Sequence, residues 1–289
     1  MPSVALVTCR DLPHGDEDGD DHVRALEKRG VAAAWHIWDD PSADWSADLV
    51  VVRSTWDYPG RREQFLSWAA SVPRLANPVA VLRWNSDKIY LSELADAGIP
   101  VVTTRWFGVA DTVVLPTGPE IVVKPSVGAG SRGVGRFLAG DATAALDHAT
   151  HLQAEGRVVM VQPYLDRVDS VGETALVYID GEFSHAIRKG AMLAPGVAQR
   201  LGPDGPQALY IQEDIRPRSV GEPELAVGRQ VMDHVRRHVD PSPLYARVDL
   251  LPSTQGPLVV ELELTEPSLF LAHAEGAVDT FARAIAGRT

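Results

Sequence analysis

A glycine-rich segment near the middle of the chain constrains the fold more than any other feature. Four glycines fall within residues 128–135, closely after Lys124 and a proline. Glycine lets backbone N–H groups approach phosphate oxygens, and a nearby lysine adds a positive charge. Residues 134–138 then read as a β-strand. We therefore expect a mobile hairpin that folds over a triphosphate, with a plain flexible turn as the alternative.

The same glycines match a second pattern, that of dinucleotide-binding folds, through Gly128, Gly130 and Gly133. That pattern needs a helix directly behind the glycines, which presents its N-terminus to a pyrophosphate. The strand-like residues 134–138 do not supply it. A Rossmann-type, NAD(P)-dependent oxidoreductase is therefore an alternative that requires a helix after Gly133.

Apolar periodicity predicts an α/β fold in three parts. Residues 1–84 alternate strands with helices, and the apolar run at 49–53 is typical of a buried parallel strand. Residues 85–160 contain a helix that Ser86 can cap, a strand over 101–107 and the glycine-rich hairpin. Residues 161–289 form the third part.

The third part is predicted to contain two hairpins. The first, over residues 175–187, surrounds an Asp–Gly pair that is typical of a two-residue turn. The second covers residues 245–264, and helices are expected over 225–238 and at the chain end. A proline- and glycine-rich segment over 194–223 predicts a loop.

The net charge of −12 argues against a nucleic acid or an anionic membrane as partner. The single cysteine, Cys9, excludes an internal disulfide. The first residues form a short apolar run broken by charge, so neither a signal peptide nor a membrane span is predicted, and we expect a cytoplasmic location. Small molecules are the expected partners, and a homodimer is compatible with the sequence. The aspartates at 16–20 predict a solvated acidic loop.

Three carboxylates lie within apolar strands near the C-terminus: Asp249, Glu261 and Glu263. Residues two apart on a strand share a face, so the two glutamates point together and can lie opposite Asp249 in a hairpin. Three neighbouring anions repel unless a cation lies between them, and oxygen ligands suit Mg²⁺. The alternative is a hairpin with acidic residues on its wet face.

Two lysines accompany these acids, Lys88 at the start of a helix and Lys124 at the end of a strand. Their order, followed by the glycines, residues 162–165 (QPYL), Asp249 and residues 261–263 (ELE), resembles the ATP-grasp superfamily. The nearest resemblance is to the glutathione-synthetase and RimK-like carboxylate–amine ligases, over roughly residues 85–268. It implies an N-terminal parallel-sheet domain and two lobes that clasp ATP.

The resemblance also implies roles for the matching residues. ATP would be bound by Lys88, Lys124, Gly128, Gly130, Ser131, Gly133, Gln162, Tyr164, Leu165 and Glu173. Magnesium, expected as two ions, would be held by Asp249, Glu261 and Glu263. The candidate catalytic residues are Lys124, Arg188 and Arg247. The family commonly has asparagine where Glu263 stands and a small residue where Glu266 stands, so this site carries additional acidic groups.

The N-terminal part contributes two polar motifs at expected strand ends, where open parallel sheets bind ligands. Together with residues 84–88, they are similar to the D-cycloserine synthetase group, which closes O-ureido-D-serine on itself. The candidate substrate residues are Cys9, Arg10, Arg53, Ser54, Thr55 and Asp57. The alternative is that these polar groups only cap and hydrogen-bond the strand ends.

These features predict an ATP- and Mg²⁺-dependent ligase that activates a carboxylate as an acyl phosphate. An amine of the same or another molecule would then displace phosphate. Cyclisation of O-ureido-D-serine to D-cycloserine is the specific reaction that the resemblance implies. A protein that binds ATP without catalysis is a further alternative.

Overall fold

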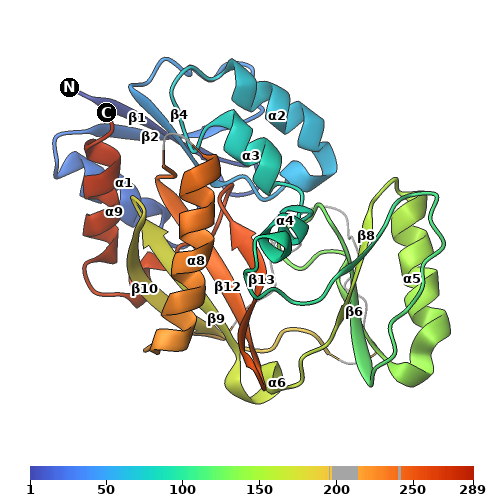
Figure 1. Ribbon diagram of the computed structural model, residues 1–289. Coiled ribbons are helices and arrows are strands. Elements are labelled where there is room, and N and C mark those ends of the chain that lie inside the picture. Colours follow the sequence, from blue (N-terminus) through green and yellow to red (C-terminus); the bar gives the residue numbers. More distant parts are fainter. Residues whose placement is uncertain (195, 197–213, 240–241) are drawn as a thin grey trace.

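The computed structural model describes residues 1–194, 196, 214–239 and 242–289 (Figure 1). Most of the loop predicted over residues 194–223 lies outside these ranges. The described strands form three sheets, which we call the N-terminal, lid and central sheets. None of the helices in the described ranges is long and apolar enough to span a membrane.

The N-terminal sheet is parallel, as predicted, with the strand order β2-β1-β3-β4. Its strands are β1 (Ser3–Thr8), β2 (Ala32–Ile37), β3 (Leu49–Ser54) and β4 (Leu75–Ala76). Alternate residues of β1 face opposite layers: Leu6 packs with helix α1 (Gly19–Glu27), and Val7 packs with α2 (Arg62–Ser71).

The C-terminal helix α9 (Ala277–Ala286) packs beside α1 on the N-terminal sheet (Figure 1). Phe281 belongs to the same buried cluster as Leu26 of α1. Outside this cluster, Arg29 and Asp279 form an ion pair of 2.5 Å. The chain therefore returns to its starting layer after it completes the other two sheets.

The lid sheet is antiparallel, with the order β5-β8-β6-β7. It contains β5 (Arg105–Phe107), β6 (Glu120–Pro125), β7 (Gly135–Leu138) and β8 (Val159–Pro163), and helix α5 (Ala142–Ala154) covers one face. The glycine-rich segment connects β6 to β7. A strand therefore follows Gly133, which contradicts the dinucleotide-binding alternative.

The central sheet has the antiparallel order β11-β10-β9-β12-β13. Its strands are β9 (Glu173–Ile179), β10 (Glu182–Lys189), β11 (Ile215–Pro217), β12 (Tyr245–Ser253) and β13 (Gly256–Glu263). Asp180 and Gly181 form the predicted turn, both with positive φ (53° and 83°). Helices α8 (Glu222–His238) and α4 (Tyr90–Asp96) cover one face (Figure 1).

Two local predictions differ from the structure, and two short helices were not predicted. Ser86 ends helix α3 (Val79–Asn85) instead of capping α4, and its hydroxyl accepts a 2.8 Å hydrogen bond from Arg62. The strand predicted over 101–107 is reduced to β5 and a single bridge at Val101. The short helices α3 and α6 (Arg167–Val171) have too few residues to show a helical period in the sequence.

Candidate active site

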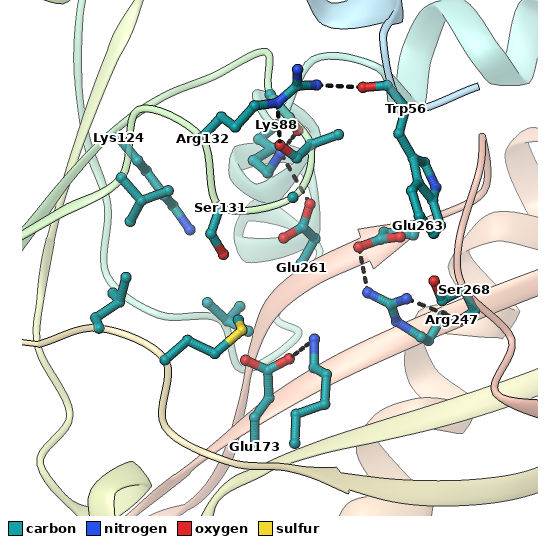
Figure 2. Close-up of a pocket in the computed structure, with 18 of the residues that line it drawn as sticks. Trp56, Lys88, Lys124, Ser131, Arg132, Glu173, Arg247, Glu261, Glu263 and Ser268 are labelled. Carbon is teal, nitrogen blue, oxygen red and sulfur yellow. Dashed lines mark hydrogen bonds and ion pairs between the residues drawn. The ribbon is translucent and has the colours of Figure 1, made fainter. Parts of the chain in front are cut away.

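A cavity of about 670 Å³ lies between the lid sheet, the central sheet and the loops after β1 and β3 (Figure 2). The lid contributes Lys124 and the glycine-rich loop, and the central sheet contributes Lys189, Arg247 and the glutamates of β13. Figure 2 shows lysines and arginines facing the carboxylates across this space. The cavity is therefore strongly charged although much of its wall is buried.

The register of β12 and β13 brings the three predicted metal ligands together. Asp249 lies opposite Glu261, and Arg247 lies opposite Glu263. Cross-strand partners in an antiparallel pair point to the same face. A β-bulge after Asp249 shifts the register below these pairs, so the alignment of the acids depends on that irregularity.

Asp249 is only 1% exposed and is held by two cations. Its two carboxylate oxygens accept bonds of 2.9 and 2.8 Å from Arg247, and Lys189 donates a further bond of 2.8 Å. Burial opposes ionisation, but Arg247 and Lys189 outweigh it and lower the pKa of the Asp249 carboxyl. Asp249 is therefore an anion at neutral pH.

The two glutamates of β13 differ in their charge state. Burial disfavours the Glu261 anion, but Lys88, at 3.0 Å, and Lys124 lower its pKa. Burial raises the pKa of Glu263 to about 7; the ion pair with Arg247 opposes this rise, and repulsion from Glu261 and Asp249 adds to it. At neutral pH the site therefore holds two ionised carboxylates, Asp249 and Glu261, and one glutamate, Glu263, that titrates near pH 7.

The chemistry of these side chains suits a hard cation such as Mg²⁺, because all the donors are carboxylate oxygens. In the described ranges, however, no group of three or more His, Cys, Asp or Glu residues is arranged to hold a metal ion. Lys88, Lys189 and Arg247 instead lie against the three acids. A metal ion would replace these contacts.

The lid side of the cavity carries the predicted phosphate-binding groups. Lys88 donates a 2.8 Å hydrogen bond to the carbonyl of Gly128, which links the loop to the central sheet through Glu261. Lys124 is 7% exposed, and burial lowers its pKa to about 8. Gly128, Gly130 and Ser131 line the cavity, whereas Gly133 does not and its carbonyl contacts His148.

The predicted nucleotide-binding residues after β8 also reach the cavity. Gln162, Tyr164, Leu165 and Glu173 all line it. Gln162 is oriented by a 2.8 Å bond from its amide nitrogen to Thr104, and Glu173 forms an ion pair with Lys189. These residues form a continuous wall between the lid and the central sheet.

Arg188, predicted as catalytic, does not line the cavity; its neighbour Lys189 does. Arg188 donates to the carbonyl of Val171 at 3.0 Å and pairs with Asp214 at 3.2 Å. A β-bulge between Phe183 and residue 185 shifts the register, so that Lys189, and not Arg188, lies opposite Glu173. The cation of β10 that lines the cavity is therefore Lys189, one position after the residue that the sequence predicted.

The predicted substrate residues of the N-terminal part are likewise not brought to the cavity. Cys9, Arg10, Arg53, Ser54, Thr55 and Asp57 are absent from the wall that the described residues form. Two of them bond near the strand ends: Ser54 bonds Thr8, and Asp57 accepts a 2.8 Å bond from Trp38. Arg53 instead forms an ion pair with Asp16, at 3.6 Å. Burial raises the pKa of Cys9 to about 11, so this thiol is not ionised.

The residues next to these motifs line the cavity instead: Leu12, Gly15, Asp16, Glu17, Trp56 and Tyr58. The acidic loop is therefore only partly solvated, contrary to the prediction. Asp18 is buried and accepts bonds from the backbone of Leu271 and Ala272, at 2.9 and 3.0 Å. These bonds fix the acidic loop against the segment that follows the central sheet. In the sequence, the regular spacing of the acidic residues was the only sign that this loop is unusual.

Comparisons with known proteins agree with this arrangement. The family described as D-cycloserine synthetase DcsG, N-terminal domain, matches residues 4–80. The cycloserine biosynthesis protein DcsG of Streptomyces lavendulae is 35% identical over 304 residues, covering 100% of this chain and 99% of that protein. The crystal structure of D-cycloserine synthetase DcsG matches with a TM-score of 0.87 at 34% identity, over 99% of both chains.

More distant solved structures share the fold. D-alanine–D-alanine ligase from Bacillus anthracis, complexed with ATP, has a TM-score of 0.69 at 14% identity and covers 100% of this chain and 97% of its own. A RimK domain ATP-grasp protein from Sphaerobacter thermophilus has a TM-score of 0.68 at 16% identity and covers 99% and 100%. At these identities the likeness supports the architecture alone.

Proposed function

The chain belongs to the D-cycloserine synthetase family of ATP-grasp ligases, and from this premise we propose that it cyclises an O-ureido amino acid at the expense of ATP. The observation that carries the proposal is the cavity in which Glu261 and Glu263 face Lys88 and Lys124 of the lid side. Asp249 does not itself line the cavity but lies opposite Glu261 on the neighbouring strand. Such an arrangement neutralises phosphate charge next to a bound acid. The relative from Streptomyces lavendulae is a cycloserine biosynthesis protein, which supports this substrate class.

ATP fits the wall between the lid and the central sheet. Lys88 and Lys124 would contact its phosphates, the loop from Gly128 would cover them, and residues 162–165 would contact the adenine. Glu173 is the candidate ribose contact. We propose Lys189 in the phosphate-facing position that Arg188 does not reach.

Asp249, Glu261 and Glu263 would hold Mg²⁺, which supplies positive charge to the ATP phosphates when bound. We propose two ions, because three carboxylates provide more oxygen ligands than one ion bound to phosphates needs. The surrounding lysines and Arg247 keep the acids close together before nucleotide binds.

In the reaction, the substrate carboxylate attacks the γ-phosphorus of ATP, and ADP leaves. The attacking nitrogen then forms the C–N bond, and the C–O bond to phosphate breaks with its electron pair on phosphate. The carbamoyl group that this nitrogen carries in an O-ureido acid is removed by water as carbamate, which decomposes to carbon dioxide and ammonia and leaves the ring N–H. An acyl phosphate hydrolyses in water, so the lid must exclude solvent during its lifetime. Arg132 of the glycine-rich loop donates to the carbonyl of Trp56 (Figure 2), which closes the loop against the N-terminal part.

An ADP-release screen with products identified by mass tests the proposed function. The acids are O-ureido-D-serine, its L-enantiomer, D- and L-amino acids and dipeptides. We expect ADP and D-cycloserine with O-ureido-D-serine, and loss of turnover in Asp249→Asn and Glu261→Gln at saturating ATP. Binding of ATP and Mg²⁺ without ADP release for any acid offered would support a protein that binds ATP without catalysis. Near-normal rates in both variants would remove these residues as metal ligands.

A homodimer and a cytoplasmic location stay predictions from the sequence. The charged cavity is formed within one chain, so a partner subunit is not required to supply any wall residue named above.

A further inference from the structure

Glu266, in the loop after β13, differs from the other cavity acids in its electrostatic environment. Glu261 and Glu263 each contact a lysine or an arginine within ion-pair distance, and so does Asp249 on the neighbouring strand. Glu266 also lines the cavity and is 8% exposed, yet it forms no ion pair with any residue in the described ranges. A carboxyl that lines a cavity and has no ion pair can accept a further hydrogen bond from a ligand there.

The N-terminal part holds Glu266 in place. The Tyr58 side chain lies beside its carboxyl and favours the charged form. The indole nitrogen of Trp56 donates a 2.9 Å bond to its backbone carbonyl. Tyr58 is 3% exposed, so both partners come from a packed segment. The position of the carboxyl is therefore fixed before a ligand arrives.

The neighbourhood of Glu266 favours an N–H donor over a metal ion. Burial, together with Glu263, raises the pKa of the Glu266 carboxyl well above its usual range, so its charge is weaker than that of the strand acids. A carboxyl group retains an acceptor oxygen whether or not it is protonated. It can therefore accept a hydrogen bond from substrate nitrogen in either state.

We propose that Glu266, positioned by Tyr58, binds the N–H of the nitrogen that attacks the acyl phosphate. This inference rests on the proposed function and names the residue of the same site that binds the attacking nitrogen. The group it would receive is an uncharged N–H nitrogen of the ureido class. As the lone pair of that nitrogen forms the C–N bond, the C–O bond to phosphate breaks. The proton lost by nitrogen goes to the departing phosphate, which leaves as hydrogen phosphate.

The nitrogen that Glu266 binds reacts only after the carboxylate has been phosphorylated, so at saturating substrate the contact matters for the second half-reaction. Loss of Glu266 should therefore slow the second half-reaction and leave the first unchanged. A metal ligand or a residue needed for folding would affect both. This separation makes the role measurable.

The test follows both half-reactions with O-ureido-D-serine, ATP and Mg²⁺. Acyl phosphate is trapped as the hydroxamate with excess hydroxylamine, and cyclised product is measured by mass. In Glu266→Ala we expect hydroxamate close to the wild-type amount and product lowered about 10- to 100-fold, the effect of one hydrogen bond in a buried site. Glu266→Gln should lose less, because its amide oxygen still accepts a hydrogen bond. Tyr58→Phe should resemble the glutamine variant.

Glu275→Gln is the matched control, since Glu275 follows in the same region of the chain but is exposed and lies outside the cavity wall. It should leave both readouts unchanged. Equal loss of hydroxamate and product in Glu266→Gln would overturn the proposal, and so would full product formation in Glu266→Ala. The midpoint of urea unfolding shows whether Glu266→Ala is folded. If it is not, the ratio of product to hydroxamate in Glu266→Gln, whose side chain has the same shape as glutamate, decides between the outcomes. Absence of hydroxamate in the unmodified protein would instead refute the proposed function.

Discussion

Lys189 and Arg188 are adjacent cations on β10 with opposite orientations, and they provide a matched test of the site. Lys189 is buried and contacts both Glu173 and Asp249. Arg188 pairs with the half-exposed Asp214 at 3.2 Å. Methionine at either position keeps an unbranched side chain and removes the charge. We therefore compare Lys189→Met with Arg188→Met.

The expected free-energy changes follow from burial. At 2.8 Å, the Lys189–Asp249 attraction is about 6 kcal/mol at an effective dielectric constant of about 20. Removing the lysine also removes the free-energy cost of burying its charge. The net loss of unfolding free energy from breaking a buried pair is therefore about 3–5 kcal/mol. A partly exposed pair such as Arg188–Asp214 contributes only about 0–1 kcal/mol. The hydrogen bond from Arg188 to Val171 adds about 1 kcal/mol.

Urea unfolding followed by circular dichroism measures these changes, and ADP release measures activity. We expect Lys189→Met to lose about 3–5 kcal/mol of unfolding free energy and its turnover. We expect Arg188→Met to lose about 1–2 kcal/mol and to keep most of its turnover. Equal destabilisation by the two substitutions would refute the assignment of Lys189 to the cavity. So would loss of turnover in the arginine variant alone.

Three further predictions concern separate parts of the molecule. Burial lowers the pKa of Lys124 to about 8, so kcat/KM for ATP should fall as the pH rises through about 8; Lys124→Arg should remove that fall, and an unchanged profile would argue against a phosphate contact. In Gly228→Ala the new Cβ would lie 2.2 Å from the Tyr178 hydroxyl, so urea unfolding should show a loss of about 1–3 kcal/mol, and a neutral result would mean that α8 can shift. Arg132→Met should raise ADP release relative to product, because the loop loses its bond to Trp56; a constant ratio would show that this bond does not retain the acyl phosphate.

Local sequence patterns were sufficient to predict much of the fold. The apolar run at 49–53 identified a parallel strand, and the Asp180–Gly181 pair located a hairpin turn, because both signals depend on neighbouring residues only. The absence of a helical pattern after Gly133 correctly indicated a strand. The short helix α3 was missed, since its seven residues are held by packing against two sheets.

The orientation of individual side chains was less accessible from the sequence. Counting back from the turn at 180–181 pairs Arg188 with Glu173, but the bulge near residue 184 moves Lys189 into that position. Bulges depend on strain and packing across the whole sheet, so the sequence alone does not locate them. Two polar motifs at the ends of β1 and β3 were assigned to substrate because they follow strand ends. In the structure, the neighbouring residues Trp56 and Tyr58 line the cavity in their place.

Oxygen transfer from the substrate carboxylate tests the central claim most directly. O-ureido-D-serine labelled with ¹⁸O in its carboxylate is turned over with ATP and Mg²⁺, and the released inorganic phosphate is analysed by mass spectrometry. If the carboxylate attacks the γ-phosphorus, the phosphate that leaves the acyl group carries one ¹⁸O atom from the substrate. Unlabelled phosphate, formed together with cyclised product, would contradict activation through an acyl phosphate.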